Sequence, residues 1–117
     1  MSPRQWRFFL EDIIRAIEKI TRYCSNIELD AFGEDEKTQD AIERNFIVFG
    51  EAAAHIPAQI VEKPPSVPWR EMRDMRNFAV HAYWGIKPAV IWDTVQNDLP
   101  PLLSLLREIL ETEAKAE

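Results

Sequence analysis

Several residue types are scarce in this chain, and each shortage excludes a class of protein. The 117 residues include one cysteine, Cys24, together with three glycines and two histidines. A single cysteine allows no intrachain disulfide and excludes a Cys-rich zinc site. No apolar run approaches the roughly 18 to 20 residues that cross a bilayer, and the first residues lack the apolar core of a signal peptide. We therefore expect one domain, residues 1–117, in the cytoplasm and away from membranes.

Positive charge is also in the minority. Fourteen Lys and Arg residues oppose twenty Asp and Glu residues, which gives a formal net charge of −6. This balance disfavours broad, sequence-independent binding to nucleic acid, because such binding depends on many phosphate contacts. It does allow a small basic cleft on an acidic surface. Any function on RNA must therefore be local.

What the chain has instead is helical periodicity. Ser2 and Pro3 suit the N-cap and first turn of a helix, which an apolar stripe extends to about residue 24. Residues 25–34 lose this pattern and predict a loop. The apolar stripe of this first helix consists of Trp6, Leu10, Ile13, Ile17, Ile20 and Cys24.

A second helix is predicted to start at Asp35 or Asp40 and to end at Pro57. Residues 57–68 contain four prolines and predict a connector with one short turn at most. The third helix is expected from Trp69 to Trp84. The stripe of the second helix consists of Ile42, Phe46, Phe49, Ala53 and Ile56.

The C-terminal part predicts one or two more helices. Gly85 suits the C-cap of the third helix, and Pro88 can open a fourth that reaches Asn97. The pair Pro100-Pro101 either kinks this helix or starts a fifth, since proline is tolerated only in a first turn. The charged tail from about residue 111 is expected to fray. The fold class is thus all-α, an antiparallel bundle of four to five helices.

The third helix has an unusual polar stripe on a helical wheel, at about 100° per residue. Arg76 and Tyr83 lie apart from this stripe, at the edge of the apolar arc. An arginine there needs a carboxylate partner, a subunit interface or an anionic ligand, because an unpaired buried charge is costly. The stripe contains Arg70, Arg73, Asn77 and His81.

Residues 76–83 form an R-N-x-x-x-H-x-Y motif whose chemistry suits cleavage of a phosphodiester. RNA carries its own nucleophile, the 2′-OH, and His81 titrates near neutrality and could take its proton. Arg76 could stabilise charge on the phosphate through paired hydrogen bonds. Asn77, Arg73 and Tyr83 could bind or orient the substrate. None of these roles requires a metal or a cofactor.

Each of these residues also has an ordinary structural interpretation. A lone histidine on a helix is most often structural or exposed, and an arginine such as Arg76 most often closes an internal ion pair, here with Glu43 or Glu51. Tyr83 would then be a core aromatic with its hydroxyl at the rim. The second histidine, His55, is near a helix C-terminus, where the helix dipole favours a cation, and is interpreted as structural.

Residues 75–86 resemble the signature of the HepT-like toxins of the HEPN superfamily, and residues 91–95 and 98–103 are similar to the segments that follow it. Upstream, residues 40–45, 50–53 and 67–69 match further landmarks, so the resemblance covers nearly the whole chain. It implies an all-helical, HEPN-like homodimer that acts as a metal-independent endoribonuclease in a prokaryotic toxin–antitoxin pair. Ala82 stands where many relatives have glycine, and Trp84 where a smaller aromatic is common.

The same resemblance implies roles for individual residues. Arg76 and His81 would be the active-site pair, repeated across the dimer interface. The antitoxin would be a minimal nucleotidyltransferase that transfers AMP to Tyr83, which places a phosphate beside Arg76 and blocks the groove. The alternative hypothesis is a non-catalytic helical dimer that binds a nucleotide or the nucleotidyltransferase, and the net charge favours it. A third is a dimeric scaffold with no ligand.

Overall fold

The computed structural model describes residues 3–81 and 87–115, and within them not the side chains of Pro3, Arg4, Phe78, Val80, His81, Ala114 and Lys115. Throughout these ranges the regular structure is helical and no strand is present. The all-α prediction is therefore confirmed. The elements are α1 (Pro3–Tyr23), α2 (Leu29–Gly33), α3 (Glu36–Ala53), α4 (Ala58–Val61), α5 (Trp69–His81), α6 (Pro88–Asp93), the π-helix η1 (Thr94–Asp98) and α7 (Leu99–Lys115).

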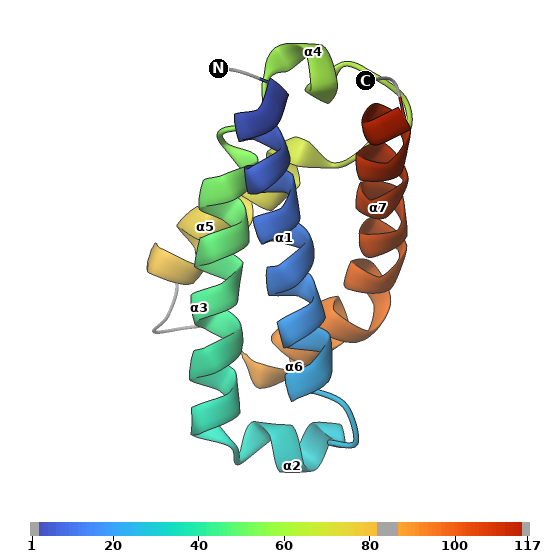
Figure 1. The fold of residues 1–117 in the computed structure, drawn as a ribbon. Coiled ribbons are helices and arrows are strands. Elements are labelled where there is room, and N and C mark those ends of the chain that lie inside the picture. The colour runs from blue at the N-terminus through green and yellow to red at the C-terminus, as the bar shows by residue number, and fades with distance from the viewer. Residues whose placement is uncertain (1–2, 82–86, 116–117) are drawn as a thin grey trace.

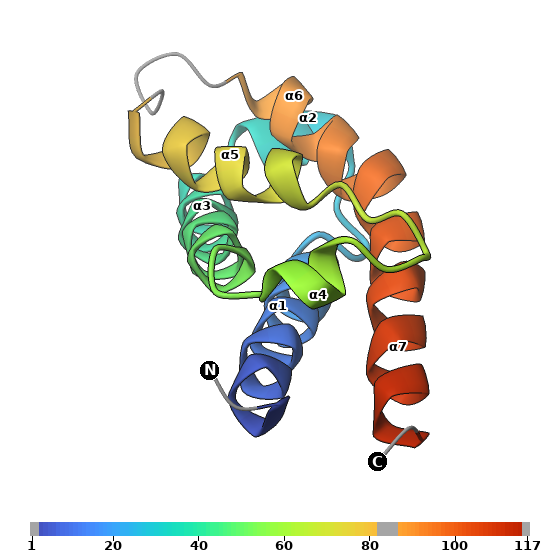
Figure 2. The ribbon, with the colours of Figure 1, turned by 90° about the horizontal axis from the view of Figure 1, so that it is seen from above.

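Three long helices run side by side with alternating direction (Figure 1). Helix α1 descends in this view, while α3 and α7 ascend on either side of it. Helix α5 crosses behind α3, as the view from above also shows (Figure 2). The short helices close the ends, with α4 at the top and α2 and α6 at the bottom. The result is an antiparallel bundle built on four helices of 13 or more residues, α1, α3, α5 and α7.

Both predicted apolar stripes lie in the core. Every member of the α1 stripe and every member of the α3 stripe is buried. Full burial of one large aliphatic or aromatic side chain stabilises a fold by roughly 1.5 to 3 kcal/mol, so these two helices carry much of the core. The largest fully buried side chains are Phe32, Phe46, Phe49, Leu10, Ile13, Ile17, Ile20, Ile42 and Leu106.

Helix α3 begins after Asp35 rather than after Asp40. The Asp35 carboxylate accepts hydrogen bonds from the Thr38 backbone N–H at 3.0 Å and from Thr38 Oγ1 at 2.7 Å. These bonds favour the charged form and lower the pKa of Asp35. Stabilisation from this N-cap is therefore present above the ordinary pKa of an aspartate and is lost as the pH falls through the lowered value.

The prediction of a loop over residues 25–34 is wrong in one part. Leu29–Gly33 forms the single-turn helix α2. Its Phe32 side chain is fully buried, and Gln39 Nε2 donates to the Phe32 carbonyl at 2.8 Å. A turn of this length shows no periodicity in the sequence, because burial of one side chain against other helices stabilises it.

Of the two alternatives for Pro100-Pro101, the start of a further helix is confirmed. The chain stays helical from Pro88 to Lys115, through α6, η1 and α7, and the prolines occupy the first turn of α7. Helix α7 continues past residue 111, where fraying is expected from the sequence, and Arg7 Nη2 donates to the Glu113 carbonyl at 2.6 Å. Among the described helices, none is both long enough and apolar enough to cross a membrane.

Candidate functional site

Helix α5, which carries most of the motif, presents the two faces that the helical wheel predicts. Arg73 and Asn77 are exposed, as is Arg70. On the opposite side Met72 and Ala79 are each 2% exposed and belong to the core. Helix α5 packs against α3 with this apolar side. The polar stripe is therefore open to solvent along the described part of the helix.

Gly50 brings the two helices unusually close at the start of the motif. A Cβ atom added to Gly50 would lie 2.9 Å from the backbone nitrogen of Arg76 and 3.1 Å from its Cα, and would clash with its Cβ. Only a residue without a side chain fits this contact. The backbone of Arg76 thus rests directly on α3.

The close approach places Arg76 beside a carboxylate of α3. Arg76 Nε donates to Glu51 Oε1, and Arg76 Nη1 donates to Asn77 Oδ1 at 3.1 Å. Glu51 is one of the two carboxylates that the sequence analysis predicts as ion-pair partners of Arg76. No described residue accepts a hydrogen bond from Nη2, so one edge of the guanidinium is left for a ligand.

The ion pair is a surface pair and not a buried one. The side chain of Arg76 is 39% exposed and that of Glu51 is 52% exposed. Exposed pairs of this kind contribute roughly 0 to 1 kcal/mol to stability. Its main consequence is geometric, because Glu51 and Asn77 together fix the plane of the guanidinium.

Glu43, the other proposed partner, makes no ion pair with a described residue. It lies seven residues before Gly50 and therefore on nearly the same side of α3, the side that faces α5. Burial raises the pKa of this carboxyl, and the charge of Asp40 raises it further. Since the folded state then favours the protonated form, the contribution of Glu43 to stability falls as the pH rises through its pKa.

The structure describes the remaining motif residues only in part. His81 is the last residue of α5, and its side chain is outside the described part. Ala82, Tyr83, Trp84 and Gly85 also lie outside the described residues. On an ideal helix, Arg76 and His81 are about 140° apart. The pairing of Arg76 with His81 and the position of Tyr83 stay predictions.

The other histidine lies elsewhere and makes a different contact. The His55 ring stacks on Phe9, with ring centroids 4.5 Å apart, at the end of the bundle near α4. This agrees with a structural interpretation of His55. Among the described residues, no group of three or more His, Cys, Asp or Glu side chains could hold a metal ion.

Sequence reasoning missed Gly50 as part of the site. A signal was available, because Gly50 is an isolated glycine within a helical pattern, and such a glycine usually has a packing reason. The sequence did not show what packs there. The contact with Arg76 depends on how α5 crosses α3, and this is decided by the whole core.

Comparison with known proteins now decides the family. The family described as "Ribonuclease HepT-like" matches residues 13–109. The chain belongs to this HepT-like ribonuclease family. The match covers α1 from Ile13 onward and the whole motif, so the family is established over nearly the full domain.

Individual HepT-like relatives agree with this assignment. A protein of Thermococcus cleftensis named as a probable ribonuclease HepT is 41% identical over 99 residues, which cover 85% of this chain and 90% of the relative. A protein of Methanocaldococcus jannaschii named as a candidate RNase is 35% identical over 111 residues, 95% of this chain and 92% of the relative. A third, from Caldanaerobacter subterraneus and named in the same way, is 32% identical over 107 residues, 92% and 96% of the two chains. No solved structure matches this HepT-like chain significantly.

Proposed function

We propose that this protein is the toxin of a prokaryotic toxin–antitoxin pair, a cytoplasmic endoribonuclease that cleaves RNA without a metal. One observation supports this most directly. In a member of a ribonuclease family, Glu51 and Asn77 hold Nε and Nη1 of the Arg76 guanidinium, so that the outer side with Nη2 has no described partner. That side is suited to a phosphate oxygen, since a planar guanidinium binds phosphate through paired hydrogen bonds.

The proposed reaction is an internal displacement at phosphorus. His81 takes the proton of the 2′-OH, the 2′ oxygen bonds to the adjacent phosphorus, and the bond from phosphorus to the 5′ oxygen breaks. The leaving 5′ oxygen receives a proton. The products are a 2′,3′-cyclic phosphate and a 5′-hydroxyl. Arg76 stabilises the charge that develops on the phosphate oxygens, while Arg73 and Tyr83 contact the flanking nucleotide.

A homodimer makes this chemistry complete. Arg76 and His81 are about 140° apart on one helix, so a single copy does not direct both at one phosphate from the same side. Around a two-fold axis, each α5 faces its own copy. His81 of one subunit then acts as the base, and His81 of the partner subunit supplies the proton to the leaving group.

Cleavage of an end-labelled RNA in EDTA tests the enzyme. The chain offers a matched control, because it has two histidines, and His55 lies outside the site against Phe9. We expect the unmodified protein and His55→Ala to cleave at similar rates. We expect His81→Ala to lose at least roughly 100-fold, the usual contribution of general acid–base catalysis.

The form of the product ends is part of this test. A 2′,3′-cyclic phosphate on the upstream fragment supports attack by the 2′-OH. Equal cleavage by His81→Ala and His55→Ala would contradict the assignment of His81, and so would cleavage that stops in EDTA. Light scattering on the same samples measures whether the active species is a dimer.

The proposed antitoxin is a minimal nucleotidyltransferase that transfers AMP from ATP to the Tyr83 hydroxyl, with release of pyrophosphate. Tyr83 and Tyr23 are the two tyrosines of the chain, so Tyr23→Phe is the natural control. After co-expression with the antitoxin, mass spectrometry should find one added AMP on the parent and on Tyr23→Phe. Tyr83→Phe should carry none and should remain toxic. Modification of Tyr83→Phe would contradict the assignment.

One observation favours the alternative of a non-catalytic partner module. Arg76 already has a carboxylate partner in Glu51, as the ordinary structural interpretation expects. On this alternative, the purified protein free of AMP cleaves no RNA, and Tyr83 still accepts AMP. The cleavage experiment therefore separates the two functions, whereas the modification experiment does not.

A further inference from the structure

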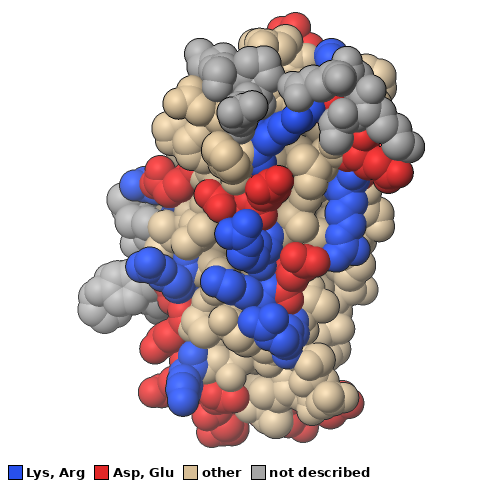
Figure 3. Space-filling view, viewed as in Figure 1, with Lys and Arg blue, Asp and Glu red and all other residues tan. Residues whose placement is uncertain are grey.

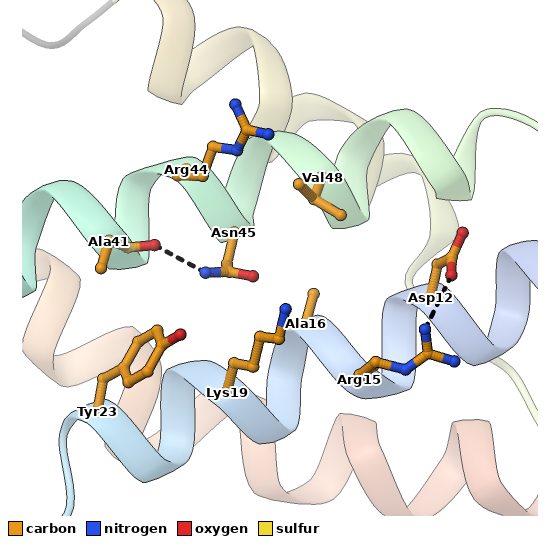
Figure 4. Close-up of a pocket in the computed structure, with 9 residues that line it drawn as sticks. All are labelled: Asp12, Arg15, Ala16, Lys19, Tyr23, Ala41, Arg44, Asn45 and Val48. Atoms are coloured by element: carbon orange, nitrogen blue, oxygen red, sulfur yellow. Dashed lines mark hydrogen bonds and ion pairs between the residues drawn. The ribbon is translucent and has the colours of Figure 1, made fainter.

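A second polar groove lies between α1 and α3, away from the motif. It has a volume of about 360 Å³. Figure 4 shows Lys19 and Tyr23 of α1 and Asn45 of α3 directed into the space between the two helices. Arg15 and Lys19 come from α1, and Arg44 comes from α3, where its side chain extends along the rim of the groove on the side away from α1. Asn45 lies opposite Lys19, and Tyr23 lies toward one end. None of these residues belongs to the motif.

The groove has the opposite charge balance to the whole protein. Its lining contains three cations and one carboxylate, Asp12, in a chain of net charge −6. Asp12 is engaged with Arg15 at 3.6 Å. Lys19 and Arg44 form no ion pair with any residue that the structure describes. Figure 3 shows several basic side chains over the middle of this face, with acidic side chains beside them.

The other groups in the groove suit nucleotides rather than a simple anion. Asn45 is 8% exposed. Its Nδ2 donates to the Ala41 carbonyl at 2.8 Å, which leaves the amide oxygen as an acceptor for a base or a 2′-OH. Tyr23 is partly exposed at one end of the groove, and the Arg22 guanidinium lies 5.6 Å from the centroid of its ring. Cations interleaved with an aromatic ring are typical of surfaces that bind single-stranded nucleic acid.

The groove also leads toward Arg76. Arg44 and Glu51 are seven residues apart on α3, which is about two helical turns. They therefore lie on nearly the same side of the helix, about 10 Å apart along its axis. Glu51 holds Arg76. A strand that contacts Arg44 would therefore continue along α3 to the guanidinium.

We propose that the α1/α3 groove binds the phosphate backbone of single-stranded RNA, at nucleotides that flank the cleaved bond. This inference rests on the proposed function, and it names the path of its substrate. Lys19 and Arg44 contact phosphates, and Tyr23 stacks with a base. The protein thereby concentrates its affinity for RNA on a groove whose lining has three cations and one carboxylate.

The test measures binding without cleavage. In the His81→Ala protein, Lys19 and Arg44 are both changed to Gln, and the affinity for a fluorescein-labelled, unstructured 12-nucleotide RNA is followed by anisotropy over a range of salt. The control changes two exposed lysines that lie outside the groove, Lys37 and Lys63, to Gln, which removes the same amount of positive charge. We expect the groove variant to bind at least ten-fold more weakly in 50 mM salt. The slope of log affinity against log salt concentration should become shallower by about 1.4, since each lost phosphate contact to single-stranded RNA accounts for about 0.7.

Each other outcome has a defined meaning. Equal losses in the groove and control variants would overturn the inference, because only total charge would matter, and no binding by any of them would overturn it as well. A shift from dimer to monomer confined to the groove variant would assign the groove to the subunit interface instead. The variant Lys19→Arg/Arg44→Lys should keep the affinity, because it keeps both positive charges, and circular dichroism of the Gln variant should match that of the parent. Loss of binding in the groove variant alone, combined with no RNA cleavage by the parent protein that retains His81, would refute the proposed function and leave the groove inference standing.

Discussion

Replacement of Arg76 by alanine should lower kcat/KM for RNA cleavage by roughly 100- to 1000-fold, the range seen when one charge-stabilising donor is removed. It should leave the melting temperature within a few degrees of the parent. The reason is the exposure of the pair, since an ion pair with 39% and 52% exposed side chains contributes little to folding. Cleavage rates and thermal melts of the same preparation measure both quantities.

The chain provides a matched control for this variant. Arg107 Nη2 donates to Glu18 Oε2 at 2.7 Å, with side chains 55% and 46% exposed, so Arg107→Ala removes a similar surface pair away from the motif. It should cleave like the parent. A conservative Arg76→Lys should recover only part of the activity, because an ammonium cannot bind Glu51, Asn77 and a phosphate in one plane. Full activity of Arg76→Ala would refute a catalytic role for Arg76.

Replacement of Gly50 by alanine is expected to damage both folding and activity. The new Cβ would meet backbone atoms of Arg76, which cannot rotate away as a flexible side chain could. Overpacking of this kind costs about 1 to 3 kcal/mol, and the higher helix propensity of alanine offsets at most about 1 kcal/mol. Because the clash is with backbone, we expect the upper part of this range, a net cost of about 1 to 2 kcal/mol. The melting temperature should therefore fall by roughly 4 to 8 °C, at about 4 °C per kcal/mol for a chain of this length.

The activity of Gly50→Ala should fall further than its stability suggests. Separation of α3 from α5 moves Arg76 relative to Glu51, and a displacement of about 1 Å at a reacting group can cost about 100-fold in rate. Gly33→Ala is the control, since nothing lies within 4 Å of a Cβ at Gly33 and its φ is not positive. It should melt at or above the parent temperature. A Gly50→Ala protein as stable as Gly33→Ala would contradict the packing argument.

The sequence predicts well those features that depend on neighbours along the chain. Pro3, Asp35 and Trp69 mark helix starts in the structure, because capping and first-turn chemistry act within a few residues. The apolar stripes of α1 and α3 are correct for the same reason. Helix α2 was missed because it depends on the burial of Phe32 by distant elements, and local periodicity carries no trace of that.

The sequence names candidate residues for the site but not the geometry that surrounds Arg76. The sequence named two carboxylates for Arg76 and could not choose between them, since the choice depends on where α5 crosses α3. Gly50 allows the close approach at this crossing, but the packing of the whole core decides where the crossing lies. The α1/α3 groove was missed entirely, because Lys19 and Arg44 are distant in the sequence and each alone is an ordinary surface charge.

The π-helix η1 allows the helical segment from Pro88 to Lys115 to pack its apolar side against two different helices. A π turn holds one more residue than an α turn, and one residue corresponds to about 100° around a helix axis. The apolar side of the chain from Pro88 to Lys115 is thereby re-phased in mid-course. Helix α6 presents it to α2, while α7 presents it to α1. The insertion works as a change of register within a continuous helical segment, so residues 88–115, about a quarter of the chain, close the bottom and the side of the bundle without a loop.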